Sequence, residues 1–283
     1  MTEAYTLLHS AEEGDAHLPS HLRAEPYCGS CRWLVSLDYD GTLRREDEGV
    51  EAEFFPLMSA LRPHGVRWGI NTGRSLHKMA ADLVHFPHLP DFLCTCERYV
   101  YLAEEDGRLA PAAAHNARCH RANMQLREAL LPTWLPALDE LRRAHPDCTW
   151  EVAADDPLSI EAVDSATMDT LMPHLLPFAR EGVAIQRAGR FMRLSDARYS
   201  KGSALRCVRE NWAVAEESLF LMGDGHNDID AFRHFPTAFR AAPRTAHPDV
   251  LAWLREHGGY LSPSLGVVEA LRHWAQVMQL TPV

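Results

Sequence analysis

The pattern of apolar and polar positions begins with a short apolar run at residues 33–37, which is typical of a buried parallel strand. A polar loop follows it, and then a helical pattern over residues 53–61 that Gly65 ends. A second apolar strand is predicted at residues 66–70, and the polar residues 71–75 open a helix that runs to about residue 85. Strand, loop and helix in repeated order predict an α/β fold with a doubly wound, Rossmann-like parallel sheet.

The rhythm changes near residue 112. A long amphipathic stretch is expected over residues 122–144, interrupted by Pro132 and Pro136. Short strands precede this change at residues 92–95 and 99–103, and after it the pattern predicts strands at 149–153 and 158–163, a helix at 166–180, and strands at 183–187 and 191–194. This order predicts an inserted α+β domain over residues 112–192.

The α/β rhythm resumes after Lys201-Gly202. The predicted elements are a helix at 203–212, a strand at 218–222, a loop at 223–228 that enters another helix, a strand at 238–241, and helices at 248–257 and 267–279. We therefore expect one core built from residues 31–111 and 193–283. Residues 1–30 are acidic and carry scattered proline and histidine, so they are expected to form a lead-in that is either loosely ordered or lies along the surface of the body.

Composition narrows the class of protein. The chain has 283 residues, 46% hydrophobic and 24% charged, which is typical of a water-soluble globular protein. No apolar run is long enough to cross a bilayer, and residues 1–20 lack the basic start and apolar stretch of a signal peptide, so a cytoplasmic location is expected. A net charge of −11 argues against nucleic acid as a partner.

The seven cysteines do not form a recognisable framework. Cys28 and Cys31 make a single C-x-x-C, and four ligands at paired spacing, as a structural zinc site requires, are not evident. A redox or zinc role for Cys28 and Cys31 stays open beside the simpler interpretation that these thiols are reduced.

Acidic residues follow two of the predicted strands. Asp38 and Asp40 come directly after one strand, and Asp224 and Asp228 come after another. Ligands of open parallel sheets bind at the carboxyl ends of the strands, so we expect both pairs to meet at one edge. Clustered carboxylates repel one another, and a divalent cation relieves that repulsion. Oxygen ligands beside a phosphate favour Mg²⁺.

Three further residues suit a phosphate site. The Thr72 hydroxyl can donate to a phosphoryl oxygen, and Gly73 allows close approach of the backbone at a helix start. Lys201 supplies a compact cation. Of the 28 basic residues only Lys78 and Lys201 are lysines, so a chain that otherwise uses arginine keeps a lysine at this position. A single ammonium can bridge a carboxylate and a phosphoryl oxygen, whereas guanidinium imposes a fork.

These segments together resemble the four motifs of the haloacid-dehalogenase-like (HAD) phosphatase superfamily. The motifs are Asp38-x-Asp40-Gly41-Thr42, Thr72-Gly73-Arg74, Lys201-Gly202 and Gly223-Asp224-x-x-Asn227-Asp228, in the order of the family. The segment at residues 112–192 resembles the type-two cap, and its αββαββ order is similar to that of the subfamily containing sucrose-phosphate and trehalose-phosphate phosphatases. One departure is the stretch at residues 94–98, where the family commonly has Asn-Gly.

The resemblance implies a role for each motif. Asp38 would attack phosphorus and become an aspartyl phosphate, and Asp40 would protonate the leaving alcohol and then activate water. The Asp38 carboxylate, the Asp40 main-chain carbonyl and the Asp224 carboxylate would hold Mg²⁺, with Asp228 acting directly or through water. Thr72 and Lys201 would neutralise the phosphoryl group.

Substrate contacts are less sharply defined. Gly73 and Arg74 are predicted to contact substrate, with a structural ion pair as the alternative for Arg74. Arg187, together with Arg190 and Arg193, is a candidate anion contact on the cap, although alternation along strands also leaves some of these on a solvent face. His226, inside the fourth motif, is expected to be a surface residue rather than a substrate contact.

The leading hypothesis is a Mg²⁺-dependent phosphomonoester hydrolase that acts on a small phosphorylated metabolite, a sugar phosphate first. A sugar phosphomutase keeps the same residues, so it remains an alternative. A dehalogenase needs neither the metal nor the second acid, and the presence of both features in this chain argues against that activity. A non-catalytic regulatory protein on this fold would be expected to lack Asp38, Asp40 or Lys201, and the chain retains all three.

Overall fold

The computed structural model describes residues 18, 22–26, 29–45, 48–153, 156–180 and 182–280. Two compact units divide the chain, and each is described by itself. The larger unit combines residues 17–112 with 201–283, and the smaller unit contains residues 113–200. The smaller unit thus ends eight residues beyond the segment 112–192 that the sequence assigns to the cap. Cys28, half of the C-x-x-C pair, lies outside the described residues.

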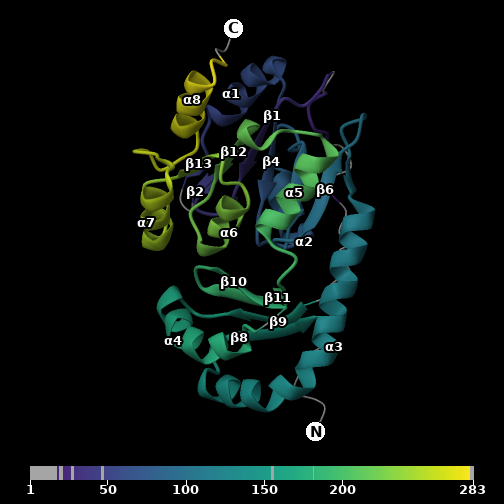
Figure 1. Ribbon diagram of the computed structural model, residues 1–283, viewed down its shortest axis with the longest axis vertical. Coiled ribbons are helices and arrows are strands. Elements are labelled where there is room, and N and C mark those ends of the chain that lie inside the picture. The colour runs from purple at the N-terminus through teal and green to yellow at the C-terminus, as the bar shows by residue number, and fades with distance from the viewer. Residues whose placement is uncertain are drawn as a thin grey trace. The chain divides into compact units, whose positions relative to one another are not determined.

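An eight-stranded sheet forms the centre of the larger unit (Figure 1). Its order is β14-β13-β12-β1-β4-β5-β6-β7, parallel from β14 to β5 and antiparallel at the β5–β6 and β6–β7 pairs. The strands are β1 (Trp33–Leu37), β4 (Val66–Asn71), β5 (Phe92–Thr95), β6 (Tyr99–Ala103), β7 (Leu109–Pro111), β12 (Leu219–Met222), β13 (Phe239–Ala242) and β14 (Tyr260–Leu261). The short strands β2 (Arg44–Arg45) and β3 (Gly49–Val50) pair only with each other. The predicted doubly wound α/β architecture is confirmed.

Alternating side chains of the central strands face two different sets of helices. Leu34 of β1 and Leu221 of β12 belong to one buried cluster with Leu205, whereas Phe220 packs against Trp274, with ring centroids 5.4 Å apart. Because neighbouring residues of a strand point to opposite faces, helices cover both faces of this sheet. The helices of the unit are α1 (Phe54–Leu61), α2 (Leu76–Leu83), α5 (Lys201–Asn211), α6 (His226–His234), α7 (Pro248–His257) and α8 (Val268–Val277).

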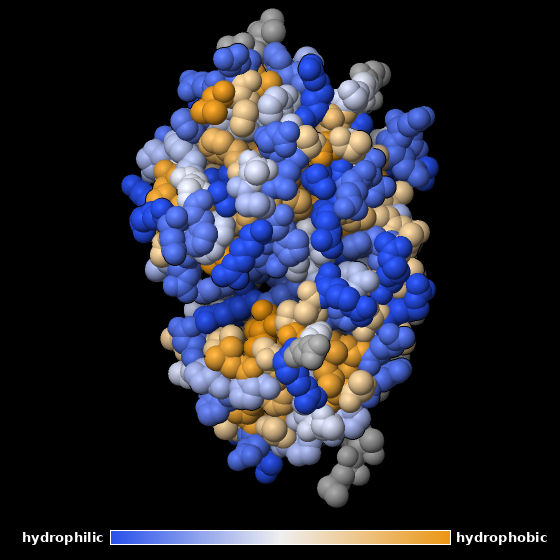
Figure 2. All heavy atoms as spheres, in the orientation of Figure 1, coloured by the Kyte–Doolittle hydropathy of each residue, from blue (hydrophilic) through white to orange (hydrophobic). Residues whose placement is uncertain are grey.

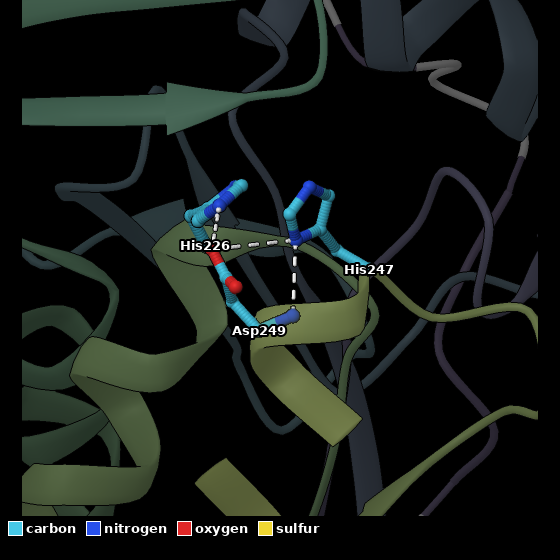
Figure 3. A group of neighbouring side chains, drawn as sticks. All are labelled: His226, His247 and Asp249. Atoms are coloured by element: carbon cyan, nitrogen blue, oxygen red, sulfur yellow. Dashed lines mark hydrogen bonds and ion pairs between the residues drawn. The ribbon is translucent and has the colours of Figure 1, made fainter. Parts of the chain in front are cut away.

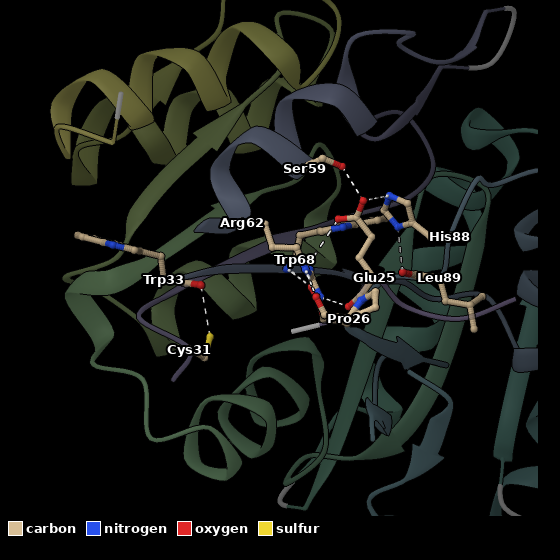
Figure 4. A network of polar contacts seen from close by, with 10 residues as sticks. Glu25, Pro26, Cys31, Trp33, Ser59, Arg62, Trp68, His88 and Leu89 are labelled. Carbon is tan, nitrogen blue, oxygen red and sulfur yellow. Dashed lines mark hydrogen bonds and ion pairs between the residues drawn. The ribbon is translucent and has the colours of Figure 1, made fainter. Parts of the chain in front are cut away.

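Residues 25 and 26, which precede β1, are hydrogen-bonded to Arg62 of the larger unit (Figure 4). The Arg62 guanidinium makes two hydrogen bonds to the Asp91 carboxylate, at 3.0 and 2.9 Å, and donates to the carbonyls of Glu25 and Pro26. Ser59 donates to the Glu25 carboxylate at 2.7 Å. These contacts connect residues 25 and 26 to α1 and to the start of β5, so this part of the lead-in lies against the core. Cys31 follows, and burial raises the pKa of its thiol to about 12.

The smaller unit is an antiparallel sheet of four strands with two helices. The strand order is β10-β11-β9-β8, and the elements are α3 (Ala113–Ala144), β8 (Thr149–Ala153), β9 (Asp156–Glu161), α4 (Ser165–Leu175), β10 (Val183–Ala188) and β11 (Phe191–Asp196). Leu158 and Ile160 of β9 pack with Met168 and Leu171 of α4 in a separate apolar core. The unit therefore has its own hydrophobic centre.

One helix differs from the sequence expectation. The amphipathic stretch expected from residue 122 and interrupted at Pro132 and Pro136 is a single helix, α3, of 32 residues that includes both prolines. A proline removes one backbone hydrogen bond and crowds the preceding turn, which favours a kink as well as a break. Figure 1 shows the ribbon of α3 changing direction along its length. Burial of Trp134 and Leu138 against the unit's core stabilises the helical conformation on either side of the prolines.

Hydrophilic side chains, with scattered apolar ones between them, cover the visible face of the larger unit (Figure 2). Among its described residues, Val84 and Val277 are the large apolar side chains that are exposed. Across the described part of the chain, no helix is both long and apolar enough to cross a membrane.

Candidate active site

The strand register brings three predicted motifs to one edge of the sheet. Leu37 of β1 stands opposite Met222 of β12 and Ile70 of β4 in parallel pairing. The residues that follow these strands therefore leave the sheet at the same end. They include Asp38, whose backbone N–H donates to the Met222 carbonyl at 2.9 Å. All the residues of the first, second and fourth motifs belong to the larger unit.

Lys201 joins two of the acidic residues. Its ammonium donates to the Asp38 carboxylate at 2.5 Å and to the Asp228 carboxylate at 2.7 Å. The lysine is the first residue of α5, and its carbonyl accepts a hydrogen bond from the Asn71 side chain at 3.0 Å. Lys201 is 1% exposed. Burial alone would lower its pKa, but Asp228 and Asp38 outweigh burial, so the pKa is raised and the ammonium stays charged.

Asp224 completes the acidic group. Thr42 donates to its carboxylate at 3.0 Å, which connects the first motif to the fourth. Two glycines make the close packing possible. A Cβ on Gly41, which has a φ of +77°, would lie 2.3 Å from an Asp224 carboxylate oxygen, and a Cβ on Gly223 would lie 2.1 Å from the Asp228 carboxyl carbon. Side chains at these positions would displace the carboxylates.

The charges of this group suit a divalent cation. Carboxylate oxygens of Asp38, Asp224 and Asp228 all lie within 4.8 Å of one another. Burial raises the pKa of Asp38 well above its ordinary value, and burial together with Asp228 raises the pKa of Asp224 to about 6. The Lys201 ammonium bonds two of these three carboxylates, and Glu97 adds a further negative charge that acts on Lys201. These oxygen ligands and the remaining negative charge fit Mg²⁺, which prefers carboxylate and water oxygens.

Asp40 is placed differently from the other three aspartates. Its carboxylate receives two hydrogen bonds from Arg74, each at 2.6 Å, and lies 3.5 Å from the Arg44 guanidinium. The side chain is 49% exposed, so this carboxylate faces solvent rather than the buried cluster. Arg74 also holds Asp82 at 2.6 Å. The structure thus pairs Asp40 and Arg74 with each other, which leaves both interpretations of Arg74, as a substrate contact or a structural partner, compatible with its position.

Thr72 is held with its hydroxyl in a defined direction. Its backbone N–H donates to the Cys94 carbonyl at 2.9 Å, and its hydroxyl oxygen accepts from the Arg74 N–H at 3.1 Å. An oxygen that already accepts one hydrogen bond can still donate its own proton, which is what a phosphoryl oxygen needs. A Cβ on the neighbouring Gly73 would lie 3.3 Å from a Glu97 carboxylate oxygen, so little space exists for a larger residue.

Glu97 is a site residue that the sequence interpretation did not identify. It is 1% exposed, it accepts a hydrogen bond from the Asn227 amide at 2.5 Å, and its charge contributes to the raised pKa of Lys201. Cys96 and Glu97 both have a positive φ, 48° and 63°. This conformation is uncommon for residues other than glycine. The only signal in the sequence was the departure from Asn-Gly at this place.

The predicted substrate contact Arg187 is held by an ion pair within its own unit. It belongs to the smaller unit, where its guanidinium pairs with Asp169 at 2.7 Å and donates to the Gly189 carbonyl at 3.0 Å. Its side chain is 14% exposed. A role for Arg187 in binding substrate stays a prediction.

No family model matches the chain. One segment is 35% identical over 94 residues to a phosphoglycolate phosphatase from Archaeoglobus fulgidus, a match that spans 32% of this chain and only 40% of the archaeal protein. Among solved structures, the sucrose-phosphatase of Synechocystis sp., in complex with sucrose and phosphate, is similar over 87% of this chain and 98% of its own, with a TM-score of 0.64 and 18% identity.

Two further structures extend the comparison. A haloacid dehalogenase-like hydrolase protein from Bacillus subtilis covers 90% of this chain and 96% of its own, with a TM-score of 0.60 and 12% identity. A sugar phosphatase of HAD subclass IIB covers 88% of this chain and all of its own, with a TM-score of 0.56 and 14% identity. The chain has the HAD fold with a cap domain. Its HAD core therefore presents Asp38, Lys201, Asp224 and Asp228 on a framework that it shares with phosphatases.

Proposed function

We propose that this protein is a Mg²⁺-dependent phosphomonoester hydrolase that acts through an aspartyl phosphate on Asp38. The observation that carries the proposal is the buried group in which the Lys201 ammonium bridges Asp38 and Asp228 beside Asp224. Such a group has a nucleophile, a cation and an unbalanced negative charge at one point. The similarity to phosphatases in fold supports the same reaction class.

The first half of the reaction is carried by Asp38 and Asp40. A carboxylate oxygen of Asp38 attacks phosphorus while the bond from phosphorus to the alcohol oxygen breaks, and Asp40 gives its proton to that alcohol. In the second half, Asp40 removes a proton from water as the water oxygen attacks phosphorus, which releases phosphate and restores the Asp38 carboxylate. A bound Mg²⁺, held by Asp38, Asp224, Asp228 and the Asp40 carbonyl, would offset the charge of the phosphoryl oxygens.

Lys201 and Thr72 bind the transferring group in this scheme. Two of the three Lys201 N–H donors are used by Asp38 and Asp228, so one remains for a phosphoryl oxygen. The Thr72 hydroxyl supplies a neutral donor. Gly73 allows the backbone at the start of the following loop to approach the phosphate. Fixed donors of this kind stabilise charge that develops in the transition state.

The contact between Arg74 and Asp40 suits only the second half of the reaction. Arg74 makes a two-pronged ion pair with Asp40 in its ionised form, which is the form needed to remove a proton from water. The first half instead needs a protonated Asp40. We therefore expect Arg74 to turn from Asp40 toward the substrate when a phosphate monoester binds, and to return after the alcohol leaves.

The proposed substrate class rests on the net charge of the chain and on the presence of the cap segment. The chain has a net charge of −11, so a small anion held by a few local cations is a better substrate than a polyanion. We assign the choice among small phosphorylated metabolites to the cap segment at residues 112–192, and propose a sugar phosphate of the cytoplasm first. The sucrose-phosphatase structure of similar fold supports that order of testing.

A phosphate-release screen tests the proposal. The purified protein is assayed with a panel of sugar phosphates, phosphoglycolate and nucleoside monophosphates, with Mg²⁺ or with excess chelator. We expect inorganic phosphate from at least one sugar phosphate with Mg²⁺, none with chelator, and none from Asp38→Asn. Movement of phosphate within the sugar without release would show a mutase instead. Turnover in chelator would contradict the metal assignment.

A further inference from the structure

A second group of possible metal ligands lies apart from the buried aspartates. It consists of His226, His247 and Asp249, shown in Figure 3. His226 is the first residue of α6, His247 precedes α7, and Asp249 lies in the first turn of α7. The three side chains converge from two helix starts. None of them has a part in the proposed hydrolysis.

The distances within this group match those between ligands of a tetrahedral metal. The His226 ring nitrogen Nε2 lies 3.0 Å from an Asp249 carboxylate oxygen, and His247 Nδ1 lies 3.7 Å from the same oxygen. A tetrahedral Zn²⁺ with bonds of about 2.0–2.1 Å places its ligand atoms about 3.3 Å apart. The two observed separations bracket that value. The three ligand atoms all lie within 4.8 Å of one another.

The chemical state of His247 also suits a ligand. Its Nδ1 accepts a hydrogen bond from the Asp249 N–H at 3.2 Å, so this nitrogen carries a lone pair and points toward the carboxylate. Binding a metal there would exchange that long hydrogen bond for a metal–nitrogen bond. The His226 and His247 rings lie next to each other, with centroids 3.9 Å apart.

We propose that His226, His247 and Asp249 form a binding site for a divalent transition-series cation, of which Zn²⁺ is the representative. Imidazole nitrogens with one carboxylate favour Zn²⁺ over Mg²⁺, which prefers oxygen ligands. The side chains are 26%, 41% and 67% exposed, so water can reach the ion and occupy its fourth position. The positive ends of α6 and α7 oppose a cation, and the Asp249 carboxylate offsets that effect.

The site is connected to the catalytic loops by the backbone. The His247 N–H donates to the Asp224 carbonyl at 2.9 Å, and His226 lies between Asp224 and Asp228 in the sequence, at the start of α6. A metal bound to residues of both helix starts would hold these two segments together. Binding of Zn²⁺ is nevertheless independent of the proposed hydrolysis, and its test does not require an active enzyme.

The experiment measures Zn²⁺ binding in a large excess of Mg²⁺, which occupies oxygen-ligand sites. The full-length protein competes with a chromophoric chelator for Zn²⁺, and Co²⁺ is added separately to record its visible absorption. His247→Asn is the main variant, because asparagine still caps the helix but lacks the imidazole. Asp249→Asn removes the carboxylate. His257→Asn, at the other end of α7, is the matched control.

We expect the wild-type protein to bind one equivalent of Zn²⁺ and to give the intense Co²⁺ bands of a low-coordinate nitrogen-ligand site. Loss of either ligand should weaken Zn²⁺ binding at least about tenfold, since even partners of ligands affect affinity by that amount. The His257→Asn protein should bind as the wild type does. If the wild type binds no Zn²⁺, or if both ligand variants bind it equally well, the group is an ordinary His–Asp contact and the proposal is wrong.

Discussion

The two units of this protein treat charged residues differently. In the larger unit, three buried or half-buried aspartates share one ammonium, that of Lys201. In the smaller unit, three arginines each pair with a single acid. These pairs are Arg187 with Asp169, Arg190 with Glu161, and Arg198 with Asp196.

This difference distinguishes ion pairs that support the structure from a charged group that needs a further ligand. A balanced pair near the surface adds little free energy and does not need a further ligand. An unbalanced buried group raises the pKa values of its own carboxyls, as Asp38 and Asp224 show, and remains unfavourable until a cation binds. We infer that reaction chemistry belongs to the larger unit and that the smaller unit contributes discrimination between substrates. The following variants test that division, from the largest expected effect to the smallest.

Asp38→Asn should have the largest effect. The amide keeps the shape of the side chain and can still accept from Lys201, but it cannot form the aspartyl phosphate. We expect kcat to fall by at least about three orders of magnitude, as for loss of other enzymatic nucleophiles. Far-UV circular dichroism should be unchanged. Retention of a tenth of the wild-type kcat would exclude Asp38 as the nucleophile.

Lys201→Arg should be nearly as damaging as Lys201→Ala, although it keeps the charge. The ammonium of Lys201, a residue that is 1% exposed, fits between two carboxylates, and the larger planar guanidinium would displace one of them. A small displacement at the reacting centre costs about a hundredfold in rate. The measurement is kcat/KM for both variants with the best substrate. Near-normal activity of Lys201→Arg would mean that only bulk charge matters.

Asp224→Asn should stabilise the metal-free protein while it impairs catalysis. The pKa of Asp224 is about 6 in the fold against an ordinary 3.8, chiefly because of burial and Asp228. The folded state thus binds more protons than the unfolded chain between these values. Stability is therefore expected to fall as pH rises from about 4 to about 6, by at most about 3 kcal/mol.

Urea unfolding in excess chelator measures this effect. The wild-type free energy of unfolding should decrease over that pH range and recover when Mg²⁺ is added at pH 7. Asp224→Asn should show a smaller decrease and little response to Mg²⁺. Because protons compete with Mg²⁺ for Asp224, the wild type should also need more Mg²⁺ below about pH 6. Equal pH profiles for the two proteins would contradict the proposed coupling.

Arg187→Ala is expected to have the smallest effect. If Arg187 contacts substrate in addition to its pairing with Asp169, its loss should raise KM about fivefold, the size of one weak ion pair, and leave kcat unchanged. Arg190→Ala is the matched control, because Arg190 pairs with Glu161 on the neighbouring strand and is 58% exposed. A lower melting temperature with unchanged KM would show that Arg187 is structural.

The sequence by itself determined the architecture of the larger unit and the position of its aspartates. The apolar runs that became β1 and β12 are local signals, and the acids that follow them need only the rule that parallel strands end at one edge. The strands predicted at 92–95 and 99–103 are also short apolar runs, and both are confirmed at the same residues. A continuous apolar run is a sufficient signal where a strand is buried along most of its length, as β1, β5 and β12 are.

Tertiary structure decided the features that depend on residues far apart in the sequence. The prolines of α3 lie within a helix because Trp134 and Leu138 are buried against the unit's core. The stabilisation from that burial cannot be recognised in a local sequence pattern. Glu97 reaches Asn227 across 130 positions and holds a positive φ that its residue type does not favour. His226, His247 and Asp249 meet only because α6 and α7 begin side by side. Such contacts depend on packing of whole elements, which residue spacing cannot express.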